Sequence, residues 1–169
     1  MEESKNPHEA VSIPDTAINP KTVPNQAPYP SRITFQMKDG SSKSINRTER
    51  HLGKGGQANV YFATDDEGQE YVIKIFDKSM YKEGEKRNPR KEFQRESNLL
   101  QKVDSPHVIK YYGETSDPDN DRYCLLLEYC NSDLQKLIDC IRLVNKSGIF
   151  PEGQARKIFD HLLQAQFDL

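Results

Sequence analysis

Residues 52–60 read Leu-Gly-Lys-Gly-Gly-Gln-Ala-Asn-Val, and Lys74 follows fourteen residues later inside the apolar run 71–76. A Gly-x-Gly turn lets backbone N–H groups approach a phosphate closely, because glycine has no Cβ to obstruct the approach. A lysine on the next strand can hold the same phosphate as a compact cation. Together the two features predict a site for a nucleotide triphosphate.

Two other phosphate-binding patterns contain similar glycines, and the surrounding residues exclude both. The dinucleotide-binding pattern needs a helix directly after the glycines. Residues 59–64 are instead β-branched and aromatic, which favours a strand. The Walker pattern Gly-x-x-x-x-Gly-Lys-Ser/Thr does not occur in the chain. The glycine segment is therefore predicted to be a loop between two strands.

The segment before this loop is predicted to be a β-hairpin over residues 32–52. Ile33, Phe35 and Met37 alternate with polar residues, and Asp39-Gly40 provides the turn. Four more β-rich runs follow at residues 59–64, 70–76, 108–112 and 123–129. From this pattern we expect an antiparallel sheet of about five strands.

Three segments have the periodicity of helices. Apolar residues three and four apart predict a helix over about residues 90–103, with Glu96 on its apolar stripe. A second helix is predicted over residues 134–144, behind Ser132-Asp133, and a third from Pro151, which suits a first helical turn. An antiparallel sheet with separate helices indicates the α+β class.

Lys74 is expected to pair with Glu96. The pleat of its strand places Lys74 on one face with Val72 and Phe76, where an unpaired ammonium would cost several kcal/mol. The alternative is a lysine that reaches water at a strand edge beside a solvated glutamate. The nearby glycine loop favours the ion pair, because both charges would then serve one ligand.

From about residue 50 to residue 169 the chain resembles the first part of a eukaryotic protein kinase domain of the serine/threonine type. Gly53 and Gly55 match the glycine-loop pattern of that family, Lys74 matches its strand-three lysine, and Glu96 matches its third-helix glutamate. In the family the glutamate fixes the lysine, and the lysine grips the α- and β-phosphates of ATP.

The resemblance also implies where ATP binds. Residues 125–130 are similar to the family's hinge, so Leu127 would be the gatekeeper, and the Glu128 carbonyl and Cys130 amide would contact adenine. Asp133 lies where many kinases place a polar residue near the ribose. The implied ATP-binding residues are Leu52, Gly53, Lys54, Gly55, Gly56, Gln57, Ala58, Val60, Val72, Lys74, Leu127, Glu128, Cys130 and Asp133.

Two positions depart from the family pattern. Ala58 replaces the third loop glycine, which adds one methyl group and reduces backbone freedom. Val72, which with Leu52 and Val60 would enclose the purine, stands where alanine is commoner and narrows the adenine slot. Neither departure argues against ATP binding.

The family's His-Arg-Asp and Asp-Phe-Gly motifs, which supply the catalytic base and magnesium ligands, do not occur in the sequence. We therefore expect a kinase-like N-lobe over residues 32–129, then the hinge exit and first C-lobe helices over residues 130–169, truncated before the catalytic loop. Such a chain would hold ATP, with magnesium expected beside it, without metal ligands of its own and without phosphate transfer.

Three hypotheses stay open. The chain could be an incomplete copy of an ATP:protein phosphotransferase that acts on serine or threonine. It could be a catalytically inactive ATP-binding module that regulates another protein. It could also be a non-folding fragment or docking protein, whose apolar helix stripes would cause aggregation.

Composition indicates which partners and which cellular location to expect. A formal net charge of −2 gives no indication of a nucleic-acid partner. No apolar run is long enough to span a membrane and no signal peptide is evident, so a cytoplasmic or nuclear location is expected. Residues 1–31 hold six of the ten prolines and are predicted to be a disordered leader. Cys124, Cys130 and Cys140 lack metal-ligand spacing and are expected to be reduced thiols in a packed interior.

Overall fold

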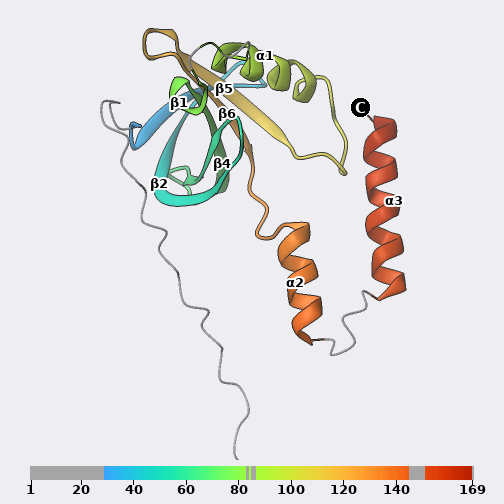
Figure 1. The fold of residues 1–169 in the computed structure, drawn as a ribbon. Coiled ribbons are helices and arrows are strands. Elements are labelled where there is room, and N and C mark those ends of the chain that lie inside the picture. Colours follow the sequence, from blue (N-terminus) through green and yellow to red (C-terminus); the bar gives the residue numbers. More distant parts are fainter. Residues whose placement is uncertain (1–28, 83, 85–86, 145–150, 169) are drawn as a thin grey trace, which may run out of the picture.

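A closed antiparallel barrel forms the main body of the molecule in this computed structural model, which describes residues 29–82, 84, 87–144 and 151–168. The strand order around the barrel is β1-β2-β3-β4-β6-β5. Figure 1 shows α1 lying across one end of the barrel, whereas α2 and α3 project away from it. The α+β class is therefore confirmed.

The elements have the following bounds. The strands are β1 (Arg32–Met37), β2 (Ser42–Lys54), β3 (Asn59–Thr64), β4 (Glu70–Asp77), β5 (Tyr111–Asp117) and β6 (Arg122–Glu128). The helices are α1 (Pro89–Leu100), α2 (Leu134–Val144) and α3 (Glu152–Asp168), and the short 3-10 turns are η1 (Lys78–Met80) and η2 (Pro118–Asn120).

The first hairpin forms as predicted. Gly40 has a φ of +86°, a left-handed conformation that favours glycine, and its N–H donates to the Met37 carbonyl at 3.0 Å. The Asp39 carboxylate accepts from the Ser41 N–H at 2.9 Å and completes the turn. Local turn chemistry therefore fixes the register between β1 and β2.

The predicted number of strands is wrong, because six strands close into the barrel. β1 pairs with β5 as well as β2, through Gln36 with Glu114 and Met37 with Gly113. The approach is so close that a Cβ on Gly113 would lie 2.5 Å from the Gln36 carbonyl oxygen. This contact joins segments far apart in the sequence, and periodicity within each segment cannot reveal it.

The bounds predicted for the strand at 108–112 are also wrong, since β5 covers Tyr111–Asp117. Residues 113–117 are Gly-Glu-Thr-Ser-Asp, a composition with weak strand preference. Pairing with β6 along this length holds them extended. The tertiary partner overrides the local preference here.

Alternation along the strands sorts the apolar side chains into two clusters. On β4 the odd-numbered residues from 71 to 75 fill the barrel, and Val72 and Phe76 lie on the opposite face with Lys74, as predicted. The inner cluster contains Phe35, Ile45, Ala63, Tyr71, Ile73, Ile75, Cys124 and Leu126. The outer cluster contains Ala58, Val72, Phe76, Phe93, Leu100, Tyr111, Tyr123, Leu125 and Leu127.

Helix α1 packs on the outer cluster through Phe93 and Leu100. Its start is well specified, because the Asn88 side chain accepts from the Lys91 N–H at 2.8 Å and Pro89 occupies the first turn. The helix ends at Leu100, so the predicted extension to residue 103 is not part of it.

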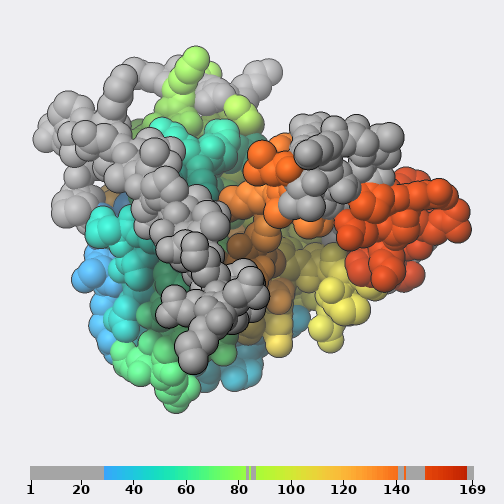
Figure 2. Space-filling model, turned by 90° about the horizontal axis from the view of Figure 1, so that it is seen from below, coloured from blue at the N-terminus to red at the C-terminus, as the bar shows by residue number. Residues whose placement is uncertain are grey.

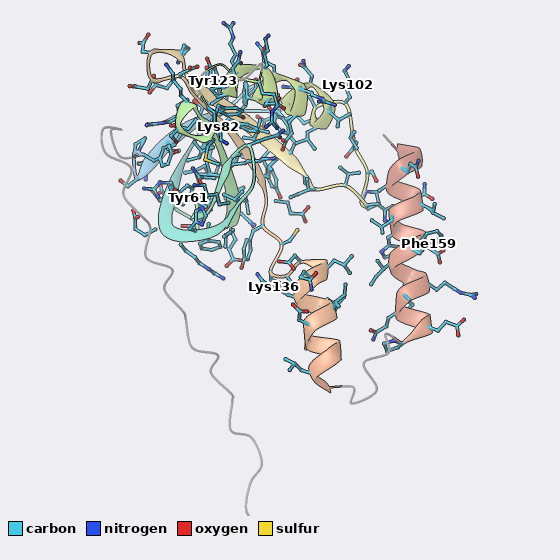
Figure 3. The ribbon with its side chains drawn as sticks, viewed as in Figure 1. Tyr61, Lys82, Lys102, Tyr123, Lys136 and Phe159 are labelled. Carbon is cyan, nitrogen blue, oxygen red and sulfur yellow. The ribbon has the colours of Figure 1, made fainter. Side chains whose placement is uncertain are left out.

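Helices α2 and α3 carry exposed apolar side chains. Phe159 on α3 is 61% exposed (Figure 3), and Leu162 is 59% exposed. Leu134 and Leu137 on α2 are also exposed. Seen from below, α3 lies at the margin of the molecule (Figure 2). Among the helices that the structure describes, none is both long and apolar enough to cross a membrane.

One expectation from composition needs correction. Cys124 is buried, but Cys130 and Cys140 are exposed, so the thiols are not all packed in an interior. Residues 1–28 of the leader predicted over residues 1–31 lie outside the described residues. Its last residues are attached to the barrel, because the Tyr29 carbonyl accepts from Arg47 Nη2 at 3.2 Å.

Candidate functional site

Lys74 and Glu96 form the expected ion pair. Lys74 Nζ lies 2.7 Å from Glu96 Oε1 and 2.6 Å from Oε2, so one ammonium bridges both carboxylate oxygens. The side chains are 25% and 28% exposed, which means that the pair is less buried than the sequence suggests. An ammonium has three donors, so one remains for an anion from solution.

The strand register explains where Lys74 lies. It stands opposite Val60 on β3 and opposite Leu125 on β6, so both neighbours share its face of the sheet. Its ammonium lies 5.2 Å from the centre of the Phe76 ring, a cation–π distance. The lysine therefore projects from a largely apolar surface toward Glu96 on α1.

The three residues expected to enclose a purine and the expected gatekeeper lie on this surface. Val72 and Leu127 are opposite each other on β4 and β6, and both are buried in the outer cluster. Leu52 and Val60 are partly buried and pack against the same cluster. The structure thus brings the apolar residues together beside the ion pair.

The glycine loop connects β2 to β3, the strands that carry Leu52 and Val60. It closes with a hydrogen bond from the Gly55 N–H to the Ala58 carbonyl at 3.1 Å. A Cβ on Gly53 or Gly56 would meet no atom within 4 Å, and neither residue has a positive φ. Packing and backbone strain in the protein therefore do not require these glycines, and the open space beside them leaves room for a ligand to approach.

Ala58, the departure from the third glycine, has a role of its own. Its side chain is only 2% exposed and belongs to the outer cluster. The methyl group therefore anchors the end of the loop, before Asn59 begins β3. Of the other loop residues, Lys54 is exposed and Gln57 is partly buried.

The hinge residues have local hydrogen-bond partners. The Glu128 N–H donates to the Lys110 carbonyl at 2.9 Å, and its carboxylate accepts from the Lys110 N–H at 3.1 Å. Asp133 caps α2, because its carboxylate accepts from the Lys136 N–H at 2.8 Å, which lowers the pKa of Asp133. Cys130 is exposed between them.

One residue at the site has no motif to predict it. The Tyr81 hydroxyl donates to the Gln57 carbonyl at 2.9 Å, so the segment after η1 contacts the tip of the glycine loop. Tyr81 lies in a stretch of mixed charge between the strand predicted over residues 70–76 and the helix predicted over about residues 90–103. No spacing or periodicity in that stretch signals the contact.

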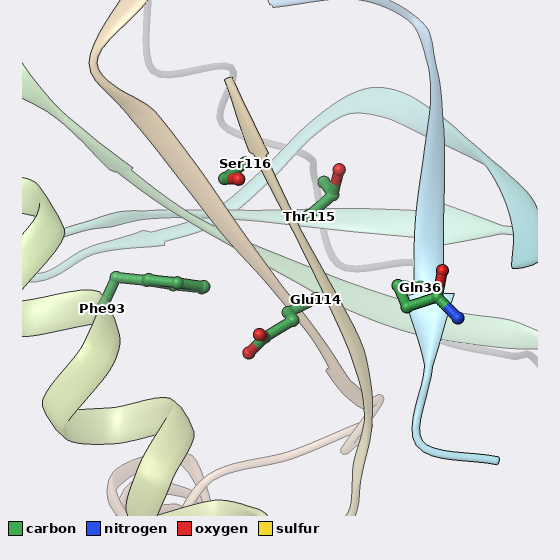
Figure 4. Close-up of a pocket in the computed structure, with 5 residues that line it drawn as sticks. All are labelled: Gln36, Phe93, Glu114, Thr115 and Ser116. Atoms are coloured by element: carbon green, nitrogen blue, oxygen red, sulfur yellow. The ribbon is translucent and has the colours of Figure 1, made fainter. Parts of the chain in front are cut away.

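A pocket of about 280 Å³ lies elsewhere, between β1, β5 and α1. It is lined by Gln36, Phe93, Glu114, Thr115 and Ser116 (Figure 4). The Glu114 carboxylate is already hydrogen-bonded to the hydroxyls of Ser97 and Tyr111. None of the residues predicted to bind ATP lines this pocket.

The donors at the site fit ATP. The open lysine donor and the accessible glycines suit phosphate, and the apolar surface beside them suits a purine. Fewer protein ligands are available for magnesium, since the described ranges contain no group of three or more His, Cys, Asp or Glu side chains placed to hold a metal ion.

Comparison with known proteins gives consistent results. Residues 46–166 match the family described as protein kinase domain. The serine/threonine-protein kinase tousled-like 2 of Xenopus tropicalis is 31% identical over 116 residues, which cover 68% of this chain and 16% of that protein. The human serine/threonine-protein kinase Nek11 is 31% identical over 121 residues, covering 68% of this chain and 17% of the relative.

A third relative, the sucrose non-fermenting protein kinase 1 of Fusarium virguliforme, is 28% identical over 150 residues, covering 88% of this chain and 19% of its own length. The chain therefore spans less than a fifth of these relatives. The family match begins at residue 46, after the closing strand β1. Because that match covers more than half of the chain and includes the whole glycine loop and the Lys74–Glu96 pair, this chain belongs to the protein kinase family.

Proposed function

We propose that this chain binds ATP as the nucleotide-binding part of a kinase that phosphorylates serine or threonine in proteins. The observation that carries the proposal is the Lys74–Glu96 pair, at 2.6 to 2.7 Å, beside a loop whose glycines face open space. Two of the three named relatives are serine/threonine-protein kinases, which supports the same substrate class.

Each part of the site then contributes a contact to ATP. Lys74 holds the α- and β-phosphates while Glu96 fixes its position, and the loop N–H groups cover the phosphates. The purine lies against Leu52, Val60, Val72 and Leu127. The Glu128 carbonyl and the Cys130 N–H meet the adenine edge, and Asp133 lies near the ribose.

Binding does not imply transfer of the γ-phosphate by this chain alone. Magnesium, when bound with ATP, neutralises charge on the phosphates. The motifs that supply its ligands and the base for the attacking hydroxyl are not in the sequence. The chain therefore holds ATP without turnover. Phosphate incorporation into a basic protein above a Lys74→Ala control would contradict this part.

Titration calorimetry with magnesium and ATP tests the binding. The native chain should bind ATP, and its free energy of unfolding should increase by RT ln(1 + [L]/Kd), which raises the melting temperature. Lys74→Ala should lose most of the affinity. Lys102→Ala, which removes an exposed lysine just after α1, is the matched control and should bind as the native chain does. No binding at millimolar ATP would overturn the proposal.

A docking role is the second candidate, favoured by the exposed apolar side chains of α2 and α3. If these exposed apolar side chains form binding surfaces, the chain should self-associate when expressed alone. Light scattering should then show less association for Phe159→Glu. A monodisperse native monomer would count against this second role.

A further inference from the structure

The tip of the glycine loop is held by a hydrogen bond from outside the loop. The Tyr81 hydroxyl donates to the Gln57 carbonyl at 2.9 Å, across 24 residues of sequence. We propose that Tyr81 is a positioning residue that holds the loop closed over the phosphate site and thereby strengthens binding of phosphorylated nucleotides. The inference rests on the proposed ATP binding and adds a residue to it.

The base from which Tyr81 reaches the loop is fixed. Asp77 is fully buried, and its carboxylate accepts from the Ser79 N–H at 2.8 Å and lies 3.4 Å from Arg122 Nε. The Tyr81 N–H donates to the Lys78 carbonyl at 3.1 Å and closes the η1 turn. A buried charge pair and a capped turn therefore set the direction of the tyrosine.

A second contact holds the loop close to the first. The Asn59 side-chain amide lies 3.3 Å from Met80 Sδ, one residue before Tyr81. Between Gln57 and Asn59 lies Ala58, whose methyl group is buried in the outer cluster. Three consecutive residues at the end of the loop and the start of β3 are thus held, two of them by the segment 78–81.

This arrangement bears on phosphate binding because of the strand register. Val60, which follows the held residues, stands directly opposite Lys74. Fixing residues 57–59 therefore also restrains Gly55, whose N–H donates to the Ala58 carbonyl, before a ligand arrives. A loop that is already ordered loses less conformational entropy on binding, so affinity is higher.

Tyr81→Phe removes the hydroxyl and keeps the ring. A neutral hydrogen bond of this kind corresponds to about a two- to tenfold change in affinity. We expect ATP to bind the variant that much more weakly, whereas adenosine, which has no phosphates, binds as before. If Tyr81 had a purely structural role, the affinities for ATP and for adenosine would fall together. Tyr112→Phe is the matched control, because that partly buried ring packs on Tyr71 of the inner cluster, away from the glycine loop.

Hydrogen exchange of the unliganded chain gives an independent readout. Amides of residues 54–58 should exchange faster in Tyr81→Phe than in the native chain or in Tyr112→Phe, with equal melting temperatures. Unchanged exchange would overturn the inference, as would faster exchange with an unchanged ratio of ATP to adenosine affinity. If the native chain binds no ATP, the proposed function fails, and the nucleotide part of this inference fails with it, whatever exchange shows about the loop.

Discussion

Gly113 lies so close to Gln36 that a Cβ on residue 113 would be 2.5 Å from the Gln36 carbonyl oxygen. That backbone contact is where β1 meets β5 and the barrel closes. Residue 113 must therefore be glycine because a Cβ does not fit there. Its φ is not positive, so the backbone conformation alone does not require glycine. The closing strand precedes the residues that match the kinase family.

Gly113→Ala should consequently destabilise the barrel. Forcing one extra carbon against backbone atoms costs about 1–3 kcal/mol in packed sites. Urea denaturation should show this loss, and hydrogen exchange should show faster exchange in residues 32–37. Gly153→Ala on α3 is the control, because its Cβ would meet no atom within 4 Å. Equal stability of the two variants would show that β1 does not close the barrel in solution.

Glu96→Gln should separate nucleotide binding from stability. The pair with Lys74 is about a quarter exposed, so its loss should cost about 1 kcal/mol or less in unfolding free energy. ATP affinity should fall about tenfold, because the lysine loses the charge that fixes it. Calorimetry and urea denaturation measure the two quantities. A large loss of stability with unchanged affinity would assign the pair a structural role only.

Local chemistry explains what the sequence could predict. Asp39-Gly40 fixes a hairpin, alternation places Lys74 with Val72 and Phe76, and helical periodicity places Glu96 on the face that meets the sheet. Barrel closure could not be predicted in this way, because it depends on Gly113 meeting a strand far away in sequence. The partner of Tyr81 is likewise a backbone carbonyl, and no residue type marks it.

A buried network at Asp65 predicts how stability depends on pH. The hydrogen bond from Lys43, with Nζ at 2.6 Å, is the main cause that lowers the pKa of Asp65 to about 2. The Gln69 N–H and the Tyr71 hydroxyl also donate to this carboxylate. An unfolded aspartate has a pKa of about 3.9, so the folded state binds fewer protons between these values.

The stabilisation should therefore be complete above about pH 4 and should be lost as pH falls toward 2. Asp65→Asn should be less stable at pH 7, and its stability should fall less over this acid range. Asp104→Asn removes an exposed carboxylate outside the network and serves as the control. Denaturant midpoints measured from pH 2 to 7 check the prediction, and parallel curves for native chain and Asp65→Asn would contradict it.

The three thiols should differ in reactivity and report on the hinge. Burial raises the pKa of Cys124 to about 12, so this thiol should react with a disulfide reagent only on unfolding. Cys130 and Cys140 are exposed and should react in the native chain. If the Cys130 N–H meets adenine, ATP should slow the reaction at Cys130 and leave that at Cys140 unchanged. Mass spectrometry of labelled peptides separates the sites, and equal rates at Cys130 with and without saturating ATP would place the nucleotide away from the hinge.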